Sequence, residues 1–213
     1  MNDMKNTKSN FEIRPIFPEL IYVSELEITE KLKEYLLNVE MRQRYPLNLG
    51  SVSTHLLHEK NSEVRNIRSK IEEHLRNYVK QILGDEFLTK INPYITQSWL
   101  NVVNPNGHHH PHMHSNSFLS GILYIKTVED DKVEFIEIRN DTNFKFREKF
   151  TTHVKVFSGN LILFNSNLPH GVPPNLNQTE NRISLSFNTF VDGLLGEEHS
   201  LSQISLNRHK KYK

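Results

Sequence analysis

The clearest pattern of apolar and polar positions in the chain is a helical stripe between Glu63 and Leu83. Apolar residues recur there at every third or fourth position, which places them on one face of an α-helix. Ser62 is a suitable N-cap and Gly84 a suitable C-terminal stop. The stripe predicts a helix that packs on the protein core through Ile67, Ile71, Leu75 and Ile82.

The segments on either side of Gln43 have weaker patterns. Ile28 to Met41 carries a second helical stripe, and Phe11 to Val23 has short apolar runs broken by two prolines, which suits edge strands or an extended arm. Gln43 to Lys60 is mixed in character and is predicted to form a loop with one short strand at Val52 to Leu57. The polar residues 1–10 are expected to be disordered, and the basic residues 209–213 to be a solvated, frayed tail.

From Ile91 onward the pattern changes to short β-rich runs that are divided by turn residues. Asn104 to Gly107 and Ser158 to Asn160 are the strongest turn signals. The predicted strands are Ile95–Val103, Ser117–Lys126, Lys132–Ile138, Thr152–Val156, Leu161–Phe164 and Arg182–Val191.

Helices followed by six or more short strands predict an α+β chain that is mainly β, with a barrel or a two-sheet sandwich of the jelly-roll kind. The helices should pack outside this core and lie mostly in the N-terminal part. Within one compact domain we expect three regions, which are a helical and extended support over 1–90, the β core over 91–195 and a tail over 196–213.

Composition narrows the class of protein. Lys plus Arg is 26 and Asp plus Glu is 25, so bulk charge does not suggest a nucleic-acid binder. The absence of cysteine excludes disulfides, thiolate metal sites and cysteine nucleophiles. No signal peptide is visible, and no apolar run approaches the roughly 20 residues of a membrane span. We therefore expect a soluble, cytoplasmic protein that is not attached to a membrane.

Candidate chemistry is concentrated between Gly107 and Lys126, a stretch that begins GHHHPHMH. Imidazole is the commonest metal-binding side chain near neutral pH, and residues i and i+2 of an extended segment point to the same side. Three overlapping His-x-His pairs are present, 108/110, 110/112 and 112/114, and the cluster alone does not choose between them. Clustered histidines can equally be a solvated surface.

A third metal ligand has to come from elsewhere in the chain, and His170 in the sequence NLPHG is the obvious source. Twelve residues later, the predicted strand from Arg182 places Arg182, Ser184 and Ser186 on one face. His55 and His58 lie in the mixed segment and are more typical of surface or satisfied polar residues than of ligands.

Three stretches resemble the iron(II)/2-oxoglutarate-dependent oxygenases, and more narrowly a group of 2-oxoglutarate–iron oxygenases found in bacteria and phages. They are WLN at 99–101, PHMHSNSFLSGILY at 111–124 and NRISLSFN at 181–188. The opening IFPELIY at 16–22 is also in that group's style, although the resemblance is specific only from about Thr96 to Phe190. It implies a double-stranded β-helix core with Fe(II), 2-oxoglutarate and O2 as cofactor and cosubstrates.

The resemblance also implies roles for individual residues. His112 matches the first iron ligand and His170 the distal iron ligand. Of the three His-x-His pairs, the resemblance therefore selects His112 and His114. Arg182 matches the arginine that binds the far carboxylate of 2-oxoglutarate, a role that suits a guanidinium fork. Ser184 and Tyr124 match hydroxyls that support this carboxylate, and Asn101 is a weaker match to an inward polar position.

The chain departs from the pattern of most of the superfamily at position 114, where the third ligand is usually Asp or Glu. Three alternatives follow. His112, His114 and His170 form a three-histidine face, or His114 swings away and leaves two ligands as in halogenase-type members, or the site is degenerate and without redox chemistry. Without the carboxylate the site is one charge more positive, which favours anionic co-ligands.

The resemblance therefore implies a 2-oxoglutarate-dependent dioxygenase, most simply a hydroxylase. Its substrate, a small molecule or a peptide, is expected over the mouth of the barrel near residues 108–110, Asn116 and 139–150. The rival from another class is a cupin-like metal- or sugar-binding module without turnover. Arg182 separates the two, because a mere metal binder has no use for a buried guanidinium opposite the metal.

Overall fold

A computed structural model describes residues 18–141, 146–174 and 179–207, and side chains are described outside 138–149. The expectations for residues 1–10 and 209–213 lie outside these ranges, as does the first part of the predicted N-terminal arm. The part of the arm that is described forms β1 (Ile21–Glu25), an edge strand of the larger sheet, which confirms the edge-strand interpretation there.

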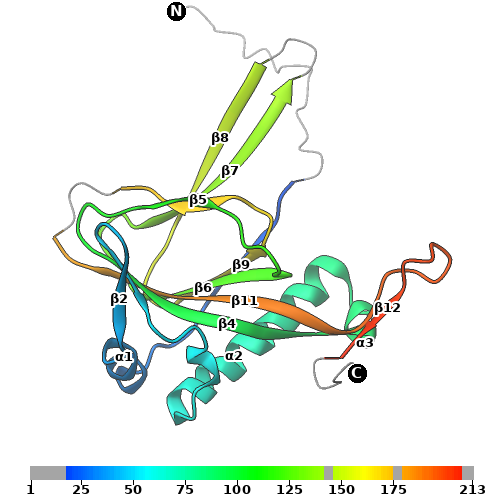
Figure 1. The fold of residues 1–213 in the computed structure, drawn as a ribbon, viewed down its shortest axis with the longest axis horizontal. Helices are drawn as coiled ribbons and strands as arrows, with labels where there is room; N and C mark the ends of the chain where they lie inside the picture. The colour runs from blue at the N-terminus through cyan, green and yellow to red at the C-terminus, as the bar shows by residue number, and fades with distance from the viewer. Residues whose placement is uncertain (1–17, 142–145, 175–178, 208–213) are drawn as a thin grey trace, which may run out of the picture.

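The described chain folds into two antiparallel sheets that face each other (Figure 1). The major sheet has the order β1-β9-β6-β11-β4-β3-β2, and β12 pairs with β11. The minor sheet has the order β5-β10-β7-β8. Strands of the major sheet after β1 are β2 (Met41–Tyr45), β3 (Asn48–Ser51), β4 (Ile91–Val103), β6 (Leu119–Lys126), β9 (Asn160–Asn165), β11 (Arg182–Leu195) and β12 (Ile204–Leu206). Those of the minor sheet are β5 (His109–His112), β7 (Lys132–Asp141), β8 (Phe146–Lys155) and β10 (His170–Val172).

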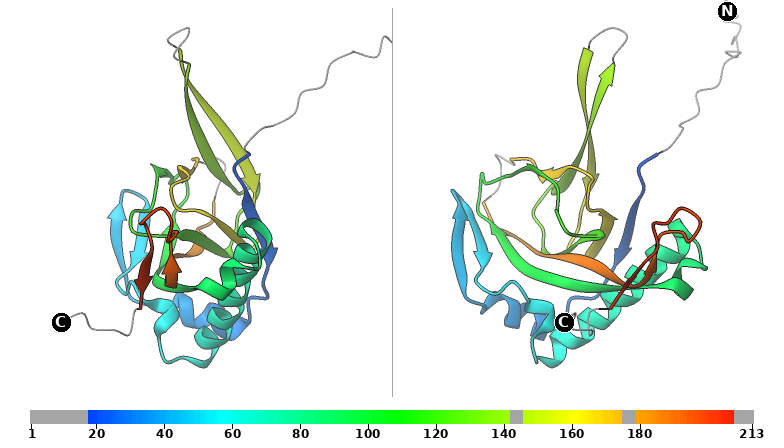
Figure 2. Two further views of the ribbon diagram at one scale, coloured as in Figure 1. Left: turned by 90° about the vertical axis from the view of Figure 1, so that its right-hand side faces the viewer. Right: turned by 45° about the vertical axis from the view of Figure 1, so that its right-hand side comes forward.

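The helices lie on the outer face of the major sheet, as Figure 2 shows from two sides. They are α1 (Glu30–Leu37), α2 (Ser62–Tyr78), which continues as a π turn over Val79–Leu83, and the short α3 (Phe87–Lys90). A single-turn 3₁₀ helix covers Leu56–His58. The mainly β core with helices outside confirms the predicted fold class, and no described helix is long and apolar enough to cross a membrane.

The stripe predicted at Glu63–Leu83 forms the main contact between helix and sheet. Ile67, Ile71 and Leu75 are buried with apolar residues of β4, β6, β9 and β11, and Ile82 packs at the edge of this cluster. Gly84 has a positive φ of 110° and ends the helix as predicted. The predicted N-cap was one residue late, because the side chain of Asn61, rather than Ser62, accepts hydrogen bonds from the amides of Glu63 and Val64.

The mixed segment from Gln43 to Lys60 is where the sequence interpretation was wrong. The structure has a hairpin of β2 and β3 there, and the strand predicted at Val52 to Leu57 does not form, since Leu56 and Leu57 lie in a 3₁₀ turn. β3 pairs with β4, with Asn48 opposite Val103. The second stripe was also too long at its end, since α1 stops at Leu37 and Met41 already begins β2.

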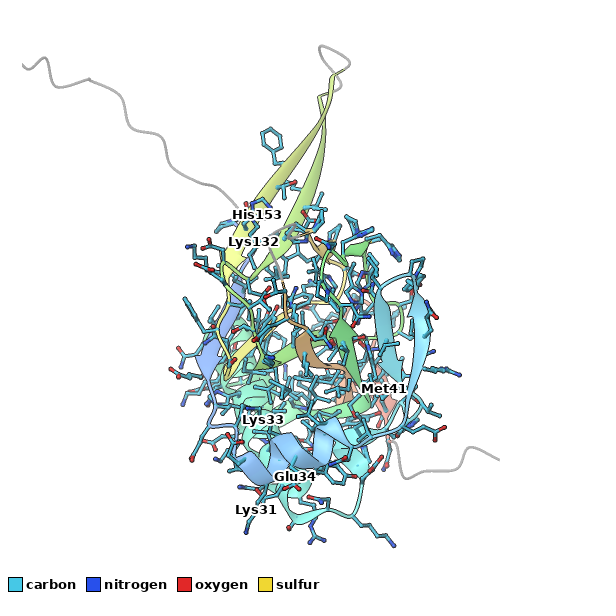
Figure 3. All side chains as sticks on the ribbon, turned by 90° about the vertical axis from the view of Figure 1, so that its left-hand side faces the viewer. Lys31, Lys33, Glu34, Met41, Lys132 and His153 are labelled. Carbon is cyan, nitrogen blue, oxygen red and sulfur yellow. The ribbon has the colours of Figure 1, made fainter. Side chains whose placement is uncertain are left out.

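The hairpin of β7 and β8 projects from the body of the molecule (Figures 1 and 2). Its described pairs run from Lys132–Lys155 at the base to Asp141–Phe146. Lys132 and His153 lie near this end of the molecule, whereas Lys31, Lys33 and Glu34 of α1 lie at the opposite end (Figure 3). The minor sheet therefore contributes one half of the barrel and a two-stranded ribbon beyond it.

Ile71 tests the packing of α2 on the major sheet, because its side chain is fully buried. Ile71→Ala should lower the free energy of unfolding by about 2–5 kcal/mol, the usual loss for removing a large buried aliphatic group. Ser69→Ala, on the exposed side of the same helix, should change it by less than about 0.5 kcal/mol. Urea unfolding of the two variants measures both values, and equal stabilities would contradict the packing described above.

Candidate metal and cosubstrate site

Two short strands of the minor sheet bring the distant histidines together. β5 and β10 pair so that His170 lies opposite His112. A Cβ on Gly171 would lie 2.8 Å from the carbonyl oxygen of His109, so only glycine allows this close approach. His114 follows β5, and its amide donates to the carbonyl oxygen of Ser166 at 3.0 Å. The structure thus brings together His112, His114 and His170.

The hydrogen bonds of the three rings fix which nitrogen faces the centre of the cluster. His112 Nδ1 lies 2.9 Å from the carbonyl oxygen of His110, and His170 Nδ1 lies 2.9 Å from that of Leu168. His114 Nδ1 lies 2.5 Å from Oδ1 of Asn188. All three acceptors are oxygens that cannot donate, so each Nδ1 carries the proton and each Nε2 keeps a free lone pair.

The free nitrogens meet in a way that fits a metal ion. The candidate ligand atoms lie within 4.8 Å of one another, and Nε2 of His112 is 3.2 Å from Nε2 of His114. Two lone pairs at this distance without a proton between them repel each other, and a cation among them removes the repulsion. Metal-binding histidines commonly donate their second ring nitrogen to an oxygen in this manner.

Burial keeps the imidazoles of His114 and His170 neutral and ready to bind a metal. It lowers the pKa of His170 to about 3, and it lowers the pKa of His114 despite the opposing hydrogen bond to Asn188. Aromatic neighbours hold the rings in place, with the centroid of Phe164 4.5 Å from that of His170 and Trp99 5.7 Å from His114. Proton competition for the buried ligand is therefore weak at neutral pH.

Asn188 is a residue that the sequence interpretation left without a role. Its Oδ1 accepts from His114, and its Nδ2 donates to Oε1 of Gln97 on β4 at 3.2 Å. It continues the i, i+2 series of Arg182, Ser184 and Ser186 along β11, and this period was the signal that could have identified it. The side-chain amide of Asn188 therefore orients His114, the histidine that stands where most of the superfamily has a carboxylate.

β11 is buried on both faces over most of its length, and each face has its own task. Ile183, Leu185 and Phe187 point into the cluster beneath the helices. Arg182, Ser184 and Ser186 line a cavity of about 640 Å³ on the other side, together with the three histidines. Arg182 is only 2% exposed, so its guanidinium belongs to the floor of the cavity and not to the surface.

The surroundings of Arg182 leave hydrogen-bonding capacity unused. Its Nε lies 3.2 Å from Oδ2 of Asp131, and its guanidinium carbon lies 5.0 Å from the centroid of the Tyr124 ring. Nε and Nη1 of Arg182, and the hydroxyl of Tyr124, are buried without a hydrogen-bond partner of good geometry in the described protein. Buried donors without partners are costly, so this corner fits an anionic ligand.

The other cosubstrate candidates divide into those that line the cavity and one that does not. Ser184 and Asn101 line it, and Asn101 Nδ2 donates to Oγ of Ser186 at 2.9 Å. Tyr124 is fully buried beneath Arg182 and is not among the residues that line the cavity. Burial raises the pKa of Tyr124 to about 12, so it remains a neutral phenol.

The remaining histidines of the cluster border the site. His109 and His110 line the cavity, but the described metal-binding group includes neither of them, nor His55 or His58. Burial and the nearby Arg182 lower the pKa of His109 to about 4. Tyr45 and His110 stack edge to face at 5.3 Å and form part of the rim with Arg44, which sequence reasoning had not included. Of the expected substrate region 139–150, residues 142–145 lie outside the described chain.

Comparison with known proteins agrees with this geometry. A family model described as "Putative 2OG-Fe(II) oxygenase" matches residues 97–188, from Gln97 through His112, His114, His170 and Arg182 to Asn188. Residues 97–188 are thus similar to the 2OG-Fe(II) oxygenase family. The resemblance inferred from the sequence is thereby confirmed, and with it the class of 2-oxoglutarate-dependent oxygenases. No curated protein sequence matches the chain.

Solved structures of 2OG-Fe(II) oxygenases share the fold at low sequence identity. A prolyl-4-hydroxylase from Pseudomonas putida is 16% identical, with a TM-score of 0.52 over 80% of this chain and 92% of that one. HygX from Streptomyces hygroscopicus, solved with nickel and 2-oxoglutarate bound, is 13% identical, with a TM-score of 0.52 over 80% and 82% of the two chains. At these identities the likeness establishes the double-stranded β-helix and no more.

The three-histidine arrangement predicts which substitutions remove metal binding. His114→Ala should weaken binding of cobalt(II) or anaerobic iron(II) by at least about tenfold, because one of three protein ligands is lost. His108→Ala, which alters an exposed residue of the same cluster, should leave it unchanged. Titration of the apoprotein with metal measures both. A loss in His108→Ala, or none in His114→Ala, would contradict the register.

Asn188 should act on the metal only through His114. Asn188→Ala should weaken metal binding by about 10–100-fold, the usual range for residues that orient a ligand. Asn66→Ala, on the exposed side of α2, serves as the control. In the His114→Ala background the substitution at 188 should have almost no further effect. Additive losses in the double variant would show that Asn188 contributes independently of His114.

Proposed function

We propose that the protein is an iron(II)- and 2-oxoglutarate-dependent hydroxylase in which His112, His114 and His170 hold the metal. The observation that carries the proposal is the position of Arg182, buried in the floor of the same cavity with donors that lack partners. A metal-binding module without turnover needs the histidines but not this guanidinium. 2-Oxoglutarate carries a keto acid that can bind a metal at one end and a carboxylate that can bind a guanidinium at the other, and this cavity offers a partner for each.

The metal site fits iron through its donor set. Three neutral imidazoles on one side leave the remaining coordination positions open toward the cavity. Iron, when bound, supplies the redox chemistry that couples oxidative decarboxylation of 2-oxoglutarate by O2 to oxidation of a substrate C–H bond. The chain contributes the orientation of the imidazoles, through the carbonyl groups of His110 and Leu168 and the side chain of Asn188.

Arg182 and Ser184 provide the second anchor for 2-oxoglutarate. A guanidinium meets a carboxylate with two parallel hydrogen bonds, and the serine hydroxyl adds a third donor from the same strand face. Tyr124 lies on the neighbouring strand with its hydroxyl unpaired, and we place it in support of Arg182 from below, through the ring that the guanidinium covers. Asn101 reaches this end of the cavity through Ser186.

The three-histidine face changes the charge of the site but not its capacity to bind an anion. With no ligand carboxylate, the metal keeps its full double charge, which attracts the keto acid end of 2-oxoglutarate. No Asp or Glu is among the described residues that line the cavity. The loss of the usual carboxylate therefore favours the anionic cosubstrate, while the substrate enters at the rim formed by Arg44, Tyr45 and His110.

Arg182→Ala should weaken 2-oxoglutarate binding by about one to two orders of magnitude, because a charge-assisted contact contributes roughly 1.5–3 kcal/mol. Metal affinity should stay nearly the same. Arg182→Lys should restore binding only in part, since it keeps the charge but not the fork. Arg68→Ala, which removes a surface arginine paired with Glu72 on α2, is the matched control.

The measurement is a titration of 2-oxoglutarate into the metal-loaded proteins, accompanied by an assay for succinate with iron(II), ascorbate and O2. We expect wild-type and Arg68→Ala proteins to bind 2-oxoglutarate equally well and the wild type to release succinate. Metal binding without 2-oxoglutarate binding or succinate would favour the cupin-like metal-binding module. Equal affinity in wild type and Arg182→Ala would remove Arg182 from the site.

A further inference from the structure

Arg182 faces a buried carboxylate that the proposed reaction does not use. Asp131 precedes β7 and is 5% exposed, while Arg182 is 2% exposed. Asp131 Oδ2 lies 3.2 Å from Nε of Arg182. The carboxylate therefore neutralises the guanidinium that the proposed function assigns to the far end of 2-oxoglutarate. Two carboxylates would then compete for one buried positive charge.

The contact between Asp131 and Arg182 is close but lacks hydrogen-bond geometry. Oδ2 of Asp131 and Nε of Arg182 both remain without a hydrogen-bond partner, as does Nη1. The pair thus compensates charge without satisfying the donors of the guanidinium. These donors are available to an incoming carboxylate, whereas the negative charge of Asp131 opposes its arrival.

Binding of 2-oxoglutarate changes the net charge around Arg182. Arg182 and an ionised Asp131 sum to zero, and adding the far carboxylate leaves this buried corner with one excess negative charge. Like charges that share a buried site raise the pKa of one of them strongly. Burial already raises the pKa of Asp131, and Arg182 is the main influence that holds it down. A second carboxylate on Arg182 weakens that influence.

The other titratable groups around the pair are poor proton acceptors. Tyr124 on β6 lies under the guanidinium and is already protonated, with a pKa of about 12. His109 on β5 faces Arg182 and is the one rival, since its pKa of about 4 would rise beside a carboxylate. The neighbouring Asp130 is exposed and pairs with Lys155 of β8 at 3.2 Å. Variants of His109 and Asp130 therefore serve as controls in the experiment below.

We propose that Asp131 takes up one proton when the far carboxylate of 2-oxoglutarate binds to Arg182. The inference rests on the proposed function of this site and adds a regulation to it. The proton comes from solvent, and no bond other than O–H at the Asp131 carboxyl forms. Since the bound state holds one more proton than the free state, 2-oxoglutarate binds more tightly as the pH falls.

The test is isothermal titration of 2-oxoglutarate into the manganese(II)-loaded full-length protein, without oxygen, between about pH 6 and 8. Both carboxylates of 2-oxoglutarate are ionised above about pH 6, like a free glutamate side chain. Repeating the titration in buffers of different ionisation enthalpy gives the number of protons taken up. The wild-type protein should take up close to one proton for each 2-oxoglutarate bound. Its affinity for 2-oxoglutarate should fall by up to about tenfold for each unit by which the pH rises.

Single-residue variants identify the residue that takes up the proton when 2-oxoglutarate binds. Asp131→Asn keeps the shape of the side chain but should abolish both the uptake and the pH dependence of affinity, leaving 2-oxoglutarate tighter than in wild type at pH 8. Asp130→Asn, which alters the exposed neighbour, and His109→Gln should both retain the uptake of wild type. Uptake that survives in Asp131→Asn but disappears in His109→Gln would overturn the assignment to Asp131.

The wild-type series can still overturn the inference if Asp131→Asn does not fold. Tight 2-oxoglutarate binding with no proton uptake at any pH in the range would overturn this inference and leave the proposed function intact. Failure of the metal-loaded wild type to bind 2-oxoglutarate would overturn the proposed function itself, and the inference with it. The two failures are thus distinguishable in a single set of titrations.

Discussion

The alternation of side chains along β11 is the constraint on which the rest of the structure depends. Successive side chains of a strand point to opposite sides, so a strand that is buried on both faces can present apolar residues to one side and polar residues to the other. Ile183, Leu185 and Phe187 face the helices, and Arg182, Ser184 and Ser186 face the cavity. A shift of one residue in the pairing of β11 with β4 would exchange these two faces. The same register therefore secures both the core and the cosubstrate corner.

The second constraint is the pairing of His170 with His112 across β10 and β5. These strands are very short, so their position depends on the rest of the minor sheet and on the close approach at Gly171. The barrel thus holds a metal-binding face and a buried guanidinium in one cavity. Asn188, at the far end of the β11 series, links the two by orienting His114.

Local periodicity predicted the elements that carry long patterns. The stripe of α2 and the long β-rich runs of β4, β6 and β11 are extensive enough to identify helix and strand. The β2–β3 hairpin has no such repeat, since nearly all of β2 is exposed, and its order comes from pairing with β4. Strands of three or four residues such as β10 and β5 likewise depend on partners far along the chain.

The residues of the candidate site divide in the same way, into those that the sequence indicates and those that depend on distant partners. The histidines and Arg182 could be selected because the resemblance gave each a position, whereas Gln97, Asn188 and Asp131 act through contacts with residues about 50 to 90 positions away. Asp131 lies in an acidic stretch that the sequence alone suggests is solvated, VEDD at 128–131. Only the fold turns one carboxylate of this stretch inward while Asp130 remains outside.

A crystal structure of the protein with manganese(II) and 2-oxoglutarate tests the central claim most directly. The account predicts one ion about 2.0–2.3 Å from Nε2 of His112, His114 and His170, a usual range for imidazole bound to first-row divalent metals. The keto acid end of 2-oxoglutarate should bind the ion, and its far carboxylate should meet Arg182. An ion held by His108 or His110, or 2-oxoglutarate bound away from Arg182, would contradict it.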